Sequence, residues 1–240
     1  MLIGNKILRF DILGSTNEYA KTIIDKAPEG IVIIAEEQRA GKGRLNKNWF
    51  SPQGGLWFSI ILKPPKPNLV SIVIGIAVCD ALKALGFSPK IKWPNDILID
   101  SKKVAGILTE IENNMLIIGI GLNLNIKKFP NNFENTATSL MIEKDGKNMG
   151  KEKVLSLVLA KIEKRYQMLI DNKTGELLEV WRHYSMIIGK EVIAKMPNCQ
   201  IEGKAVDIDE DGALLIKTAN GSIQKIIAAN CTIKDIMHNP

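Results

Sequence analysis

The sequence IKWPNDILIDSKKVAGIL spans residues 91–108. Two apolar runs within it, at 96–99 and 104–108, flank the polar residues 100–103. Apolar runs on either side of a short turn-forming segment predict a β-hairpin. Tryptophan, proline and asparagine stand directly in front of the first strand, and a lysine stands beside small residues in the second. The hairpin is therefore a candidate functional site as well as a piece of sheet.

Apolar segments with two different spacings surround this hairpin. Short apolar runs predict buried strands, whereas apolar residues that recur every three or four positions predict helices with one buried face. The clearest helical spacing is at 69–85. We expect strands at 31–35, 56–62 and 115–124, and helices at 69–85, 151–170, about 174–185, and from Ser15-Thr16-Asn17 to about Lys26.

The C-terminal part of the chain has a different pattern. Short strands alternate there with the turn-forming pairs Pro197-Asn198, Asp211-Gly212 and Asn220-Gly221. Asp-Gly and Asn-Gly between alternating apolar runs are strong hairpin signals. About 50 residues of this kind predict a small β-barrel of SH3-like size. We therefore expect two domains, residues 1–187 and 188–240. The strands expected in the second are 191–195, 201–207, 213–218 and 222–227.

Composition limits the class of protein. Hydrophobic residues make up 45% of the 240 residues, which is enough for a sizeable core. The sequence contains no stretch of about 18 uncharged apolar residues and no secretory signal pattern, so we expect neither a membrane span nor export. Three scattered cysteines and two histidines argue against a zinc site or a disulfide framework. These features predict a cytoplasmic protein.

The net charge of +6 comes from 32 basic and 26 acidic residues. A basic protein attracts anions in general, including nucleotides, nucleic acids and acidic proteins. The sequence has no run of five or more like charges. A lysine-rich surface exposed to solvent is the simpler explanation, so we do not expect DNA binding.

Residues 38–49 form a loop rich in glycine and positive charge. Gly41 and Gly43 would let backbone N–H groups approach an anion closely, while Lys42 and Arg44 add positive charge. Ligands often bind where a strand ends in such a loop. The loop lacks the Gly-x4-Gly-Lys-Ser/Thr order of a P-loop. It is either an anion-binding loop or a mobile basic surface loop.

The predicted hairpin carries two groups with alternative interpretations. Asp96 is suited to binding a cation or holding a lysine, and Asn95 to donating to a phosphate; alternatively, both only form a turn. Lys103 opens a strand of small apolar residues, from which it could enter a pocket and meet an anionic oxygen. Alternatively, it is an edge lysine that discourages aggregation, the role we assign to Lys102.

Two further segments are candidates. Residues 119–123 have the sequence GIGLN, and glycines in a strand predict close approach of a ligand or another backbone. Asn123 could then contact a base or a ribose; a glycine-kinked core strand is the alternative. Ser15-Thr16-Asn17 could cap a helix, a role compatible with ligand binding because helix N-termini attract anions.

Taken in order, these motifs resemble those of the biotin–protein ligases. The order is Ser-Thr-Asn, Gln-x-x-Gly-Lys-Gly-Arg with a tryptophan five residues on, Lys-Trp-Pro-Asn-Asp, Lys-x-Ala-Gly, Gly-x-Gly-x-Asn and a small β-barrel. The likeness covers essentially the whole chain. The chain reaches Ser15 almost at once, so it resembles the type without a helix-turn-helix repressor domain.

The resemblance implies an α+β fold: a mixed, mostly antiparallel sheet with helices on one side, as in class II synthetases, followed by an SH3-like barrel. It implies formation of biotinyl-5′-AMP from biotin and ATP, with Mg²⁺ entering only with ATP and no resident metal. It further implies transfer of biotin to a lysine of a biotin carboxyl carrier protein, and a homodimer.

The resemblance also implies the site residues. Lys103, Arg44 and Lys42 would be catalytic, and Gly106 would leave room for the biotin ring. Biotin and the acyl-phosphate would be surrounded by Ser15, Thr16, Asn17, Gln38, Gly41, Lys42, Gly43, Arg44, Trp49, Lys103 and Gly106. ATP would be contacted by Arg44, Trp49, Asn95, Asp96, Lys103 and Asn123.

The chemistry agrees with this assignment. Joining a carboxylate to an α-phosphate brings two anions together, and positive side chains must neutralise both. Lys103 is expected at the junction, with Arg44 and Lys42 over the phosphates. Lys42 stands where many relatives carry arginine, so it lacks the bidentate fork of a guanidinium. Residues 45–47, Leu-Asn-Lys, replace a more basic or glycine-bearing stretch, in which Asn46 can adopt a left-handed conformation.

Two other functions fit less well. A lipoate ligase or octanoyltransferase of the same superfamily would bind a linear acyl chain in a tunnel, and the Lys-Trp-Pro-Asn-Asp and Gly-Lys-Gly-Arg motifs argue against it. A nucleic-acid-binding regulator would use the basic charge and the barrel, but the sequence shows no helix-turn-helix pattern.

Overall fold

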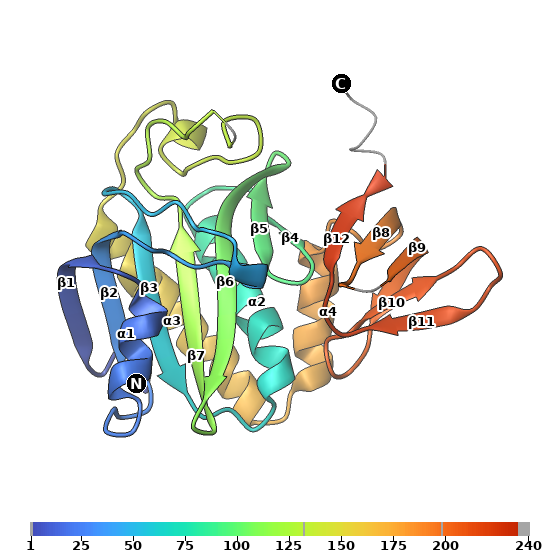
Figure 1. The fold of residues 1–240 in the computed structure, drawn as a ribbon, viewed down its shortest axis with the longest axis horizontal. Coiled ribbons are helices and arrows are strands. Elements are labelled where there is room, and N and C mark those ends of the chain that lie inside the picture. Colours follow the sequence, from blue (N-terminus) through green and yellow to red (C-terminus); the bar gives the residue numbers. More distant parts are fainter. Residues whose placement is uncertain (1, 132, 198, 235–240) are drawn as a thin grey trace.

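The computed structural model describes residues 2–131, 133–197 and 199–234. Its larger sheet has seven strands in the order β1-β2-β3-β7-β6-β5-β4 (Figure 1). Within the described residues β1 and β2 pair in parallel, and the other neighbouring strands pair antiparallel. The mixed, mostly antiparallel sheet is therefore confirmed. Its strands are β1 (Ile7–Leu13), β2 (Val32–Gln38), β3 (Leu56–Leu62), β4 (Lys90–Lys92), β5 (Asp96–Ile99), β6 (Lys102–Glu112) and β7 (Met115–Leu122).

The predicted hairpin lies at one side of this sheet as β5 and β6. Asp100 and Ser101 join the two strands, with φ angles of 45° and 66°. Two consecutive residues with positive φ are what the favoured two-residue hairpin turn requires. The turn is shorter than the four residues expected, so Lys102 and Lys103 belong to β6. The backbone of Lys103 pairs with neighbours on both sides, which fixes where its side chain starts.

Helices cover both faces of the seven-stranded sheet (Figure 1). Val32 and Ile34 of β2 belong to the main core with α2 and α3, whereas Ile33 packs in a second cluster with Ala20 of α1. Successive side chains of a strand point to opposite faces, so the two clusters lie on opposite sides. The helices α2, α3 and α4 thus lie on one side of the sheet, as the family resemblance implies. The helix α1, which was not expected there, lies on the other side. The interior strand β3 is buried at every residue, which requires that both faces of the sheet are covered.

The helix predicted at 69–85 is confirmed as α2, which packs against α3 and β6. The helical residues 67–84 are long and apolar enough to cross a membrane. However, 67% of that stretch is buried inside the fold, as expected of a core helix. The helices are α1 (Thr16–Ile23), α2 (Val70–Ala84), α3 (Lys151–Ile170) and α4 (Thr174–Tyr184), with 3-10 turns at Arg44–Asn46, Pro67–Leu69 and Ile142–Lys144.

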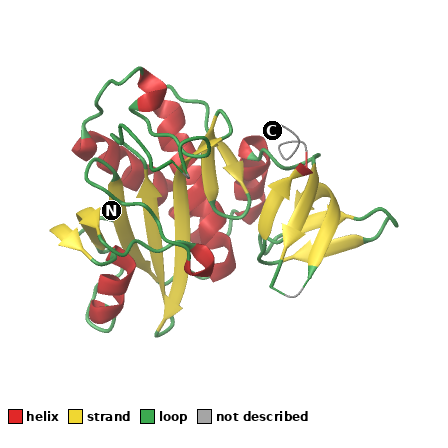
Figure 2. Cartoon of the chain, turned by 45° about the horizontal axis from the view of Figure 1, so that its top comes forward, coloured by secondary structure: helices red, strands yellow, loops and turns green. Residues whose placement is uncertain are grey.

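A second, antiparallel sheet follows beside α4, in the order β11-β10-β9-β8-β12 (Figures 1 and 2). The hairpin signals Asp211-Gly212 and Asn220-Gly221 are confirmed, since they separate β9 from β10 and β10 from β11. Asn198 of the predicted turn lies outside the described residues. The small β-domain is confirmed, while its boundary after residue 187 stays a prediction. Its strands are β8 (Glu191–Lys195), β9 (Gln200–Ile208), β10 (Leu214–Lys217), β11 (Ile223–Ile226) and β12 (Asn230–Ile233).

Three strands were not predicted, β1, β4 and β12, and each lies at the edge of a sheet. An edge strand has one neighbour and is partly exposed, so its sequence carries a weaker apolar signal. Arg9 and Asp11, for example, interrupt the apolar residues of β1. The prediction for α1 was too long: the helix ends at Ile23, not near Lys26. Its N-cap residue, Ser15, makes no side-chain capping bond to any described residue.

Candidate active site

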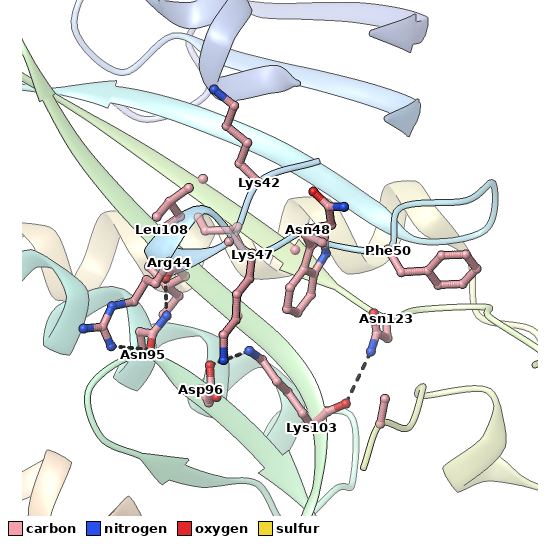
Figure 3. A pocket seen from close by; sticks show the side chains of 18 of the residues that line it. Lys42, Arg44, Lys47, Asn48, Phe50, Asn95, Asp96, Lys103, Leu108 and Asn123 are labelled. Carbon is pink, nitrogen blue, oxygen red and sulfur yellow. Dashed lines mark hydrogen bonds and ion pairs between the residues drawn. The ribbon is translucent and has the colours of Figure 1, made fainter. Parts of the chain in front are cut away.

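A cavity of about 260 Å³ lies where the glycine-rich loop passes over β6 and β7 (Figure 3). It brings together the start of α1, the loop, the β5–β6 hairpin and β7, which are far apart in the sequence. Every predicted site residue except Gly41 lines it. These residues are Ser15, Thr16, Asn17, Gln38, Lys42, Gly43, Arg44, Trp49, Asn95, Asp96, Lys103, Gly106 and Asn123.

Gly41 is buried inside the loop and shapes it. A Cβ atom at this position would lie 2.5 Å from both Ser51 Oγ and the Trp49 carbonyl oxygen. The Gly41 carbonyl accepts a 2.8 Å hydrogen bond from the Trp49 amide, which closes the loop. Gly41 is not among the residues that line the cavity, and glycine is needed here for close packing of the loop. Its predicted contact with the ligand stays a prediction. The left-handed residue described in this loop is Leu45, with φ 55° and ψ 38°, where we expected Asn46.

The floor of the cavity is a buried network of neutral polar groups. Gln38 Oε1 accepts from the backbone N–H and the hydroxyl of Thr16, at 2.8 and 3.1 Å. Ser59 is fully buried, and its hydroxyl donates to Asn17 Oδ1 at 2.6 Å and lies 2.7 Å from Thr16 Oγ1. Gln38 Nε2 donates to Ser51 Oγ at 2.9 Å. Such a satisfied network holds donors and acceptors in fixed positions for a polar, uncharged ring.

Lys103 enters the cavity and pairs with Asp96 at 2.6 Å. Its ammonium also lies 4.7 Å from the centre of the Trp49 ring. These contacts decide between the alternatives left open by the sequence, because Asp96 holds a lysine and Lys103 is a cavity residue. Neighbouring Lys102 is exposed, as expected of an edge lysine. The side chain of Lys103 is 32% exposed, so an anion could still reach it.

Arg44 links the loop to both sheets. Its Nη1 donates to Asn95 Oδ1 and to the Ala229 carbonyl, each at 3.3 Å. Burial lowers the pKa of the Arg44 guanidinium, and the charge of Asp96 partly offsets this effect. A guanidinium stays charged even so. Arg44 therefore presents a fixed positive charge at the boundary between the cavity and the C-terminal sheet.

The glycines of β6 and β7 make room for protein side chains. A Cβ atom on Gly106 would lie 2.9 Å from the Trp49 ring, and one on Gly121 would lie 2.4 Å from Trp49 Nε1. A Cβ atom on Gly119 would lie 2.4 Å from Asn17 Oδ1. Gly106 lines the cavity and makes room for the tryptophan that forms one of its walls. That it also leaves room for biotin stays a prediction.

Asn123 holds the backbone on which the site residue Lys103 lies. It is buried, and its Nδ2 donates to the carbonyls of Lys103 and Thr138 at 3.3 and 2.9 Å. Its backbone N–H donates to Val104 at 2.8 Å. These contacts favour a role in fixing the Lys103 backbone over the predicted contact with a base or ribose.

Sequence reasoning missed one wall of the cavity and several groups on the others. The missed wall comes from the long connection after β7, whose aromatic residues in a polar segment were the available signal. Asn230 reaches the cavity from β12, an edge strand without any motif. The missed residues are Leu45, Lys47, Asn48, Phe50, Ile107, Leu108, Phe129, Phe133, Thr136, Ala137 and Asn230. Gly119, Ile120 and Gly121 also line the cavity, within the candidate segment 119–123.

Comparison with known proteins finds similarity along most of the chain. Residues 10–125 match the model of the biotin/lipoate A/B protein ligase family, and residues 187–233 match that of the biotin protein ligase C-terminal domain. The bifunctional ligase/repressor BirA of Bacillus subtilis is 35% identical over 95% of this chain and 74% of its own length. The chain belongs to the biotin protein ligase family.

Two further relatives match the ligase over nearly their full length. The biotin–[acetyl-CoA-carboxylase] ligase of Mycobacterium tuberculosis is 29% identical, over 98% of this chain and 91% of its own. Among solved structures, the biotin protein ligase of Aquifex aeolicus in complex with biotin and ATP is similar, with a TM-score of 0.87 and 31% identity. The match covers 96% of this ligase and 99% of the Aquifex chain, so it includes both sheets.

Proposed function

We propose that this protein activates biotin with ATP to biotinyl-5′-AMP and then transfers biotin to a lysine of a carrier protein. The observation that carries the proposal is the pairing, in one cavity, of a neutral polar floor with four cationic residues, Lys42, Arg44, Lys47 and Lys103. The floor suits an uncharged ring with N–H and C=O groups, and the cations suit the anionic groups that react. Family membership and a structural relative that binds biotin and ATP support the same function.

The first step joins two anions. A biotin carboxylate oxygen attacks the α-phosphorus of ATP, the bond from that phosphorus to the β-phosphate bridging oxygen breaks, and pyrophosphate leaves. Negative charge builds on the α-phosphate as the bond forms, and fixed cations in a cavity of low polarity stabilise it. We assign Lys103 to the carboxylate–phosphate junction, because Asp96 and the Trp49 ring hold its ammonium inside the cavity.

Arg44 and Lys42 are assigned to the phosphate groups. Arg44 is anchored by Asn95 and by the C-terminal sheet, so its charge needs little reorganisation. Lys42 comes from the loop and is more exposed. In the second step the acceptor amine attacks the biotinyl carbonyl and AMP leaves, so the protein itself needs no nucleophile.

Magnesium is expected to enter with ATP. Among the described residues that line the cavity, Asp96 is the one carboxylate. No group of three or more His, Cys, Asp or Glu that could hold a metal is found in the described part of the chain. Proteins usually bind Mg²⁺ through one or two carboxylates together with substrate phosphates, and Asp96 with the Asn95 amide oxygen fits that donor set.

The test is pyrophosphate release from purified protein with biotin and Mg-ATP, followed by biotin transfer to a carrier domain such as that of acetyl-CoA carboxylase. Pyrophosphate release should require biotin, and an excess of lipoate should not compete with biotin for the cavity. Lack of both release and transfer would overturn the proposal, and competition by lipoate would reassign the acyl group. A cytoplasmic location, pairing of two copies and lack of DNA binding stay predictions.

A further inference from the structure

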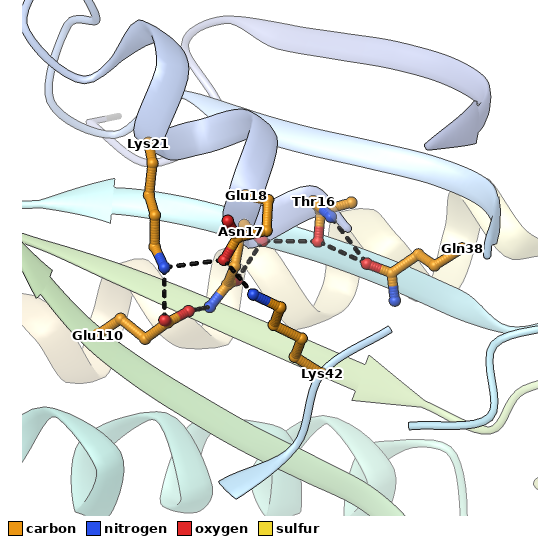
Figure 4. A network of polar contacts seen from close by, with 8 residues as sticks. Thr16, Asn17, Glu18, Lys21, Gln38, Lys42 and Glu110 are labelled. Atoms are coloured by element: carbon orange, nitrogen blue, oxygen red, sulfur yellow. Dashed lines mark hydrogen bonds and ion pairs between the residues drawn. The ribbon is translucent and has the colours of Figure 1, made fainter. Parts of the chain in front are cut away.

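A row of ion pairs runs from the glycine-rich loop to the floor of the cavity (Figure 4). Lys42 Nζ donates to Glu18 Oε1 at 2.7 Å, and Lys21 Nζ donates to the same oxygen at 2.8 Å. Lys21 also donates to Glu110 Oε1 at 2.7 Å. Positive and negative side chains therefore alternate along the row, in the order Lys42, Glu18, Lys21, Glu110.

The row ends on the cavity floor. Glu110 Oε2 accepts a 2.7 Å hydrogen bond from Asn17 Nδ2, and Asn17 Oδ1 accepts from the buried Ser59. Gly119 leaves space for the Asn17 amide, which a Cβ atom at this position would displace. One polar network thus connects Lys42, a loop residue assigned to phosphate, with Asn17, a floor residue.

The outer pair of the row is its most exposed part. The side chains of Lys42 and Glu18 are 47% and 43% exposed, against 26% for Lys21 and 27% for Glu110. Exposed ion pairs are weak, whereas a charge-assisted bond to phosphate in a cavity is stronger. If Lys42 leaves, Glu18 keeps its bond to Lys21 and is not left unpaired. Lys42 is therefore the member of the row that can change partners.

The surroundings keep Glu18 charged. Lys21, and then Lys42, hold the pKa of the Glu18 carboxyl below its usual range. Glu110 and Glu18 raise the pKa of the Lys21 ammonium. These shifts favour the charged forms of Glu18 and Lys21. In Figure 3, Lys42 extends away from Asp96 and Lys103, toward α1.

We propose that Glu18 is a positioning residue that competes with the adenylate phosphate for Lys42. This inference rests on the proposed function, and in particular on the assignment of Lys42 to phosphate. A phosphate that gains Lys42 must break the Glu18–Lys42 pair, so Glu18 weakens adenylate binding and gives Lys42 a defined partner between turnovers. An uncharged ligand leaves the pair intact, and its affinity does not depend on Glu18.

The experiment measures the dissociation constant of a non-hydrolysable biotinyl-AMP analogue, in which a phosphodiester replaces the acyl-phosphate. Calorimetry is run on the wild-type protein, Glu18→Gln, Lys42→Ala and the double variant. Since an exposed ion pair contributes about 0.2–1 kcal/mol, Glu18→Gln should tighten binding by about 1.5- to 5-fold. The same substitution should have no effect in the Lys42→Ala background, and the gain should shrink as salt screens the pair.

Two controls match this design. Glu36 is a carboxylate of similar exposure, 47%, and pairs with Lys151 at 2.8 Å outside the cavity lining, so Glu36→Gln should leave the affinity unchanged. Biotinamide lacks an anionic group, so Glu18→Gln should not alter its binding. Glu18→Ala gives a second variant in which the direction should be the same, and thermal melting checks that each variant is folded.

Unchanged or weaker analogue binding in Glu18→Gln would overturn the inference, because Lys42 then would not exchange partners. An equal gain in affinity from Glu18→Gln with and without Lys42 would also overturn it. Glu18 would then affect binding through the structure of α1 and not through its pair with Lys42. Failure of the ligase assignment looks different: the wild-type protein would not bind the analogue at all.

Discussion

The two sides of the cavity hold their lysines in different ways. On the strand side, Lys103 lies in β6 and pairs with Asp96 of β5, with side chains 32% and 26% exposed. On the loop side, Lys42 pairs with Glu18, and these side chains are 47% and 43% exposed. Lys103 starts from a backbone paired on both sides, whereas Lys42 comes from a loop held by a few turn hydrogen bonds.

This difference suggests that the two lysines have different roles in the reaction. A charge that is fixed before reaction stabilises a transition state without reorganisation, so the strand side is suited to bond formation. A charge on an exposed, exchangeable pair is suited to capture and release of a ligand. We therefore expect substitutions on the strand side to change the rate of adenylate formation, and substitutions on the loop side to change its retention.

The largest effect is expected for Lys103→Ala. Loss of one fixed donor to a developing anion costs about 10²- to 10³-fold in rate, so biotin-dependent pyrophosphate release should fall by that factor. Lys102→Ala is the matched control, because Lys102 is the preceding residue of β6 and is exposed. Equal losses in the two variants, or near-normal release in Lys103→Ala, would place the reacting lysine elsewhere.

A smaller effect is expected for Gly121→Ala. The added methyl group would lie 2.4 Å from Trp49 Nε1, so the ring, which Lys103 contacts, must shift. Overpacking of this kind costs about 1–3 kcal/mol in unfolding free energy, measurable by denaturant titration. Gly175→Ala is the control, since nothing lies within 4 Å of a Cβ atom there. Unchanged stability in Gly121→Ala would show that Trp49 is not fixed by β7.

Lys42→Arg tests the loop side. A guanidinium offers a bidentate fork to phosphate, and one more net hydrogen bond is worth about 0.5–1.5 kcal/mol, or about twofold to tenfold in affinity. The adenylate analogue should bind more tightly and dissociate more slowly, with little change in the rate of pyrophosphate release. A change in that rate comparable to Lys103→Ala would remove the distinction between the two sides.

The smallest effect is expected for Leu45→Asn. Leu45 has a left-handed backbone and a 65% exposed side chain, so it gains little from burial. Asparagine tolerates this conformation better, and the substitution should stabilise the protein by about 0.5–1 kcal/mol. Thermal melting checks this expectation, and a lower melting temperature would mean that the Leu45 side chain contributes contacts that matter.

Most of the strand side could be predicted from the sequence. The hairpin signal around residues 100–103 is local, and it places Asp96 and Lys103 on the two neighbouring strands of one hairpin. The floor was predicted in part: Thr16, Asn17 and Gln38 were found, but Ser59 was not. A serine in the middle of an apolar strand has no local pattern that reveals which side chains it meets across the sheet.

The loop side and the far wall were less predictable. The Glu18–Lys42 pair joins residues from α1 and the loop, and only the packing of α1 on its own sheet face makes it possible. Asn230 enters from an edge strand of the other sheet, and Phe129 and Phe133 from an irregular connection. These positions depend on tertiary contacts over long sequence separations, which hydrophobic spacing and turn signals do not encode.

The most direct test is the thermal stability of the protein with biotin, with Mg-ATP and with both. A ligand at 1,000 times its dissociation constant stabilises the folded state by about 4 kcal/mol. If the cavity makes and holds an adenylate, biotin and Mg-ATP together should raise the melting temperature well beyond the sum of their separate effects, and Lys103→Ala should lose the excess. A rise no larger than that sum, in a protein that binds both ligands, would contradict the account.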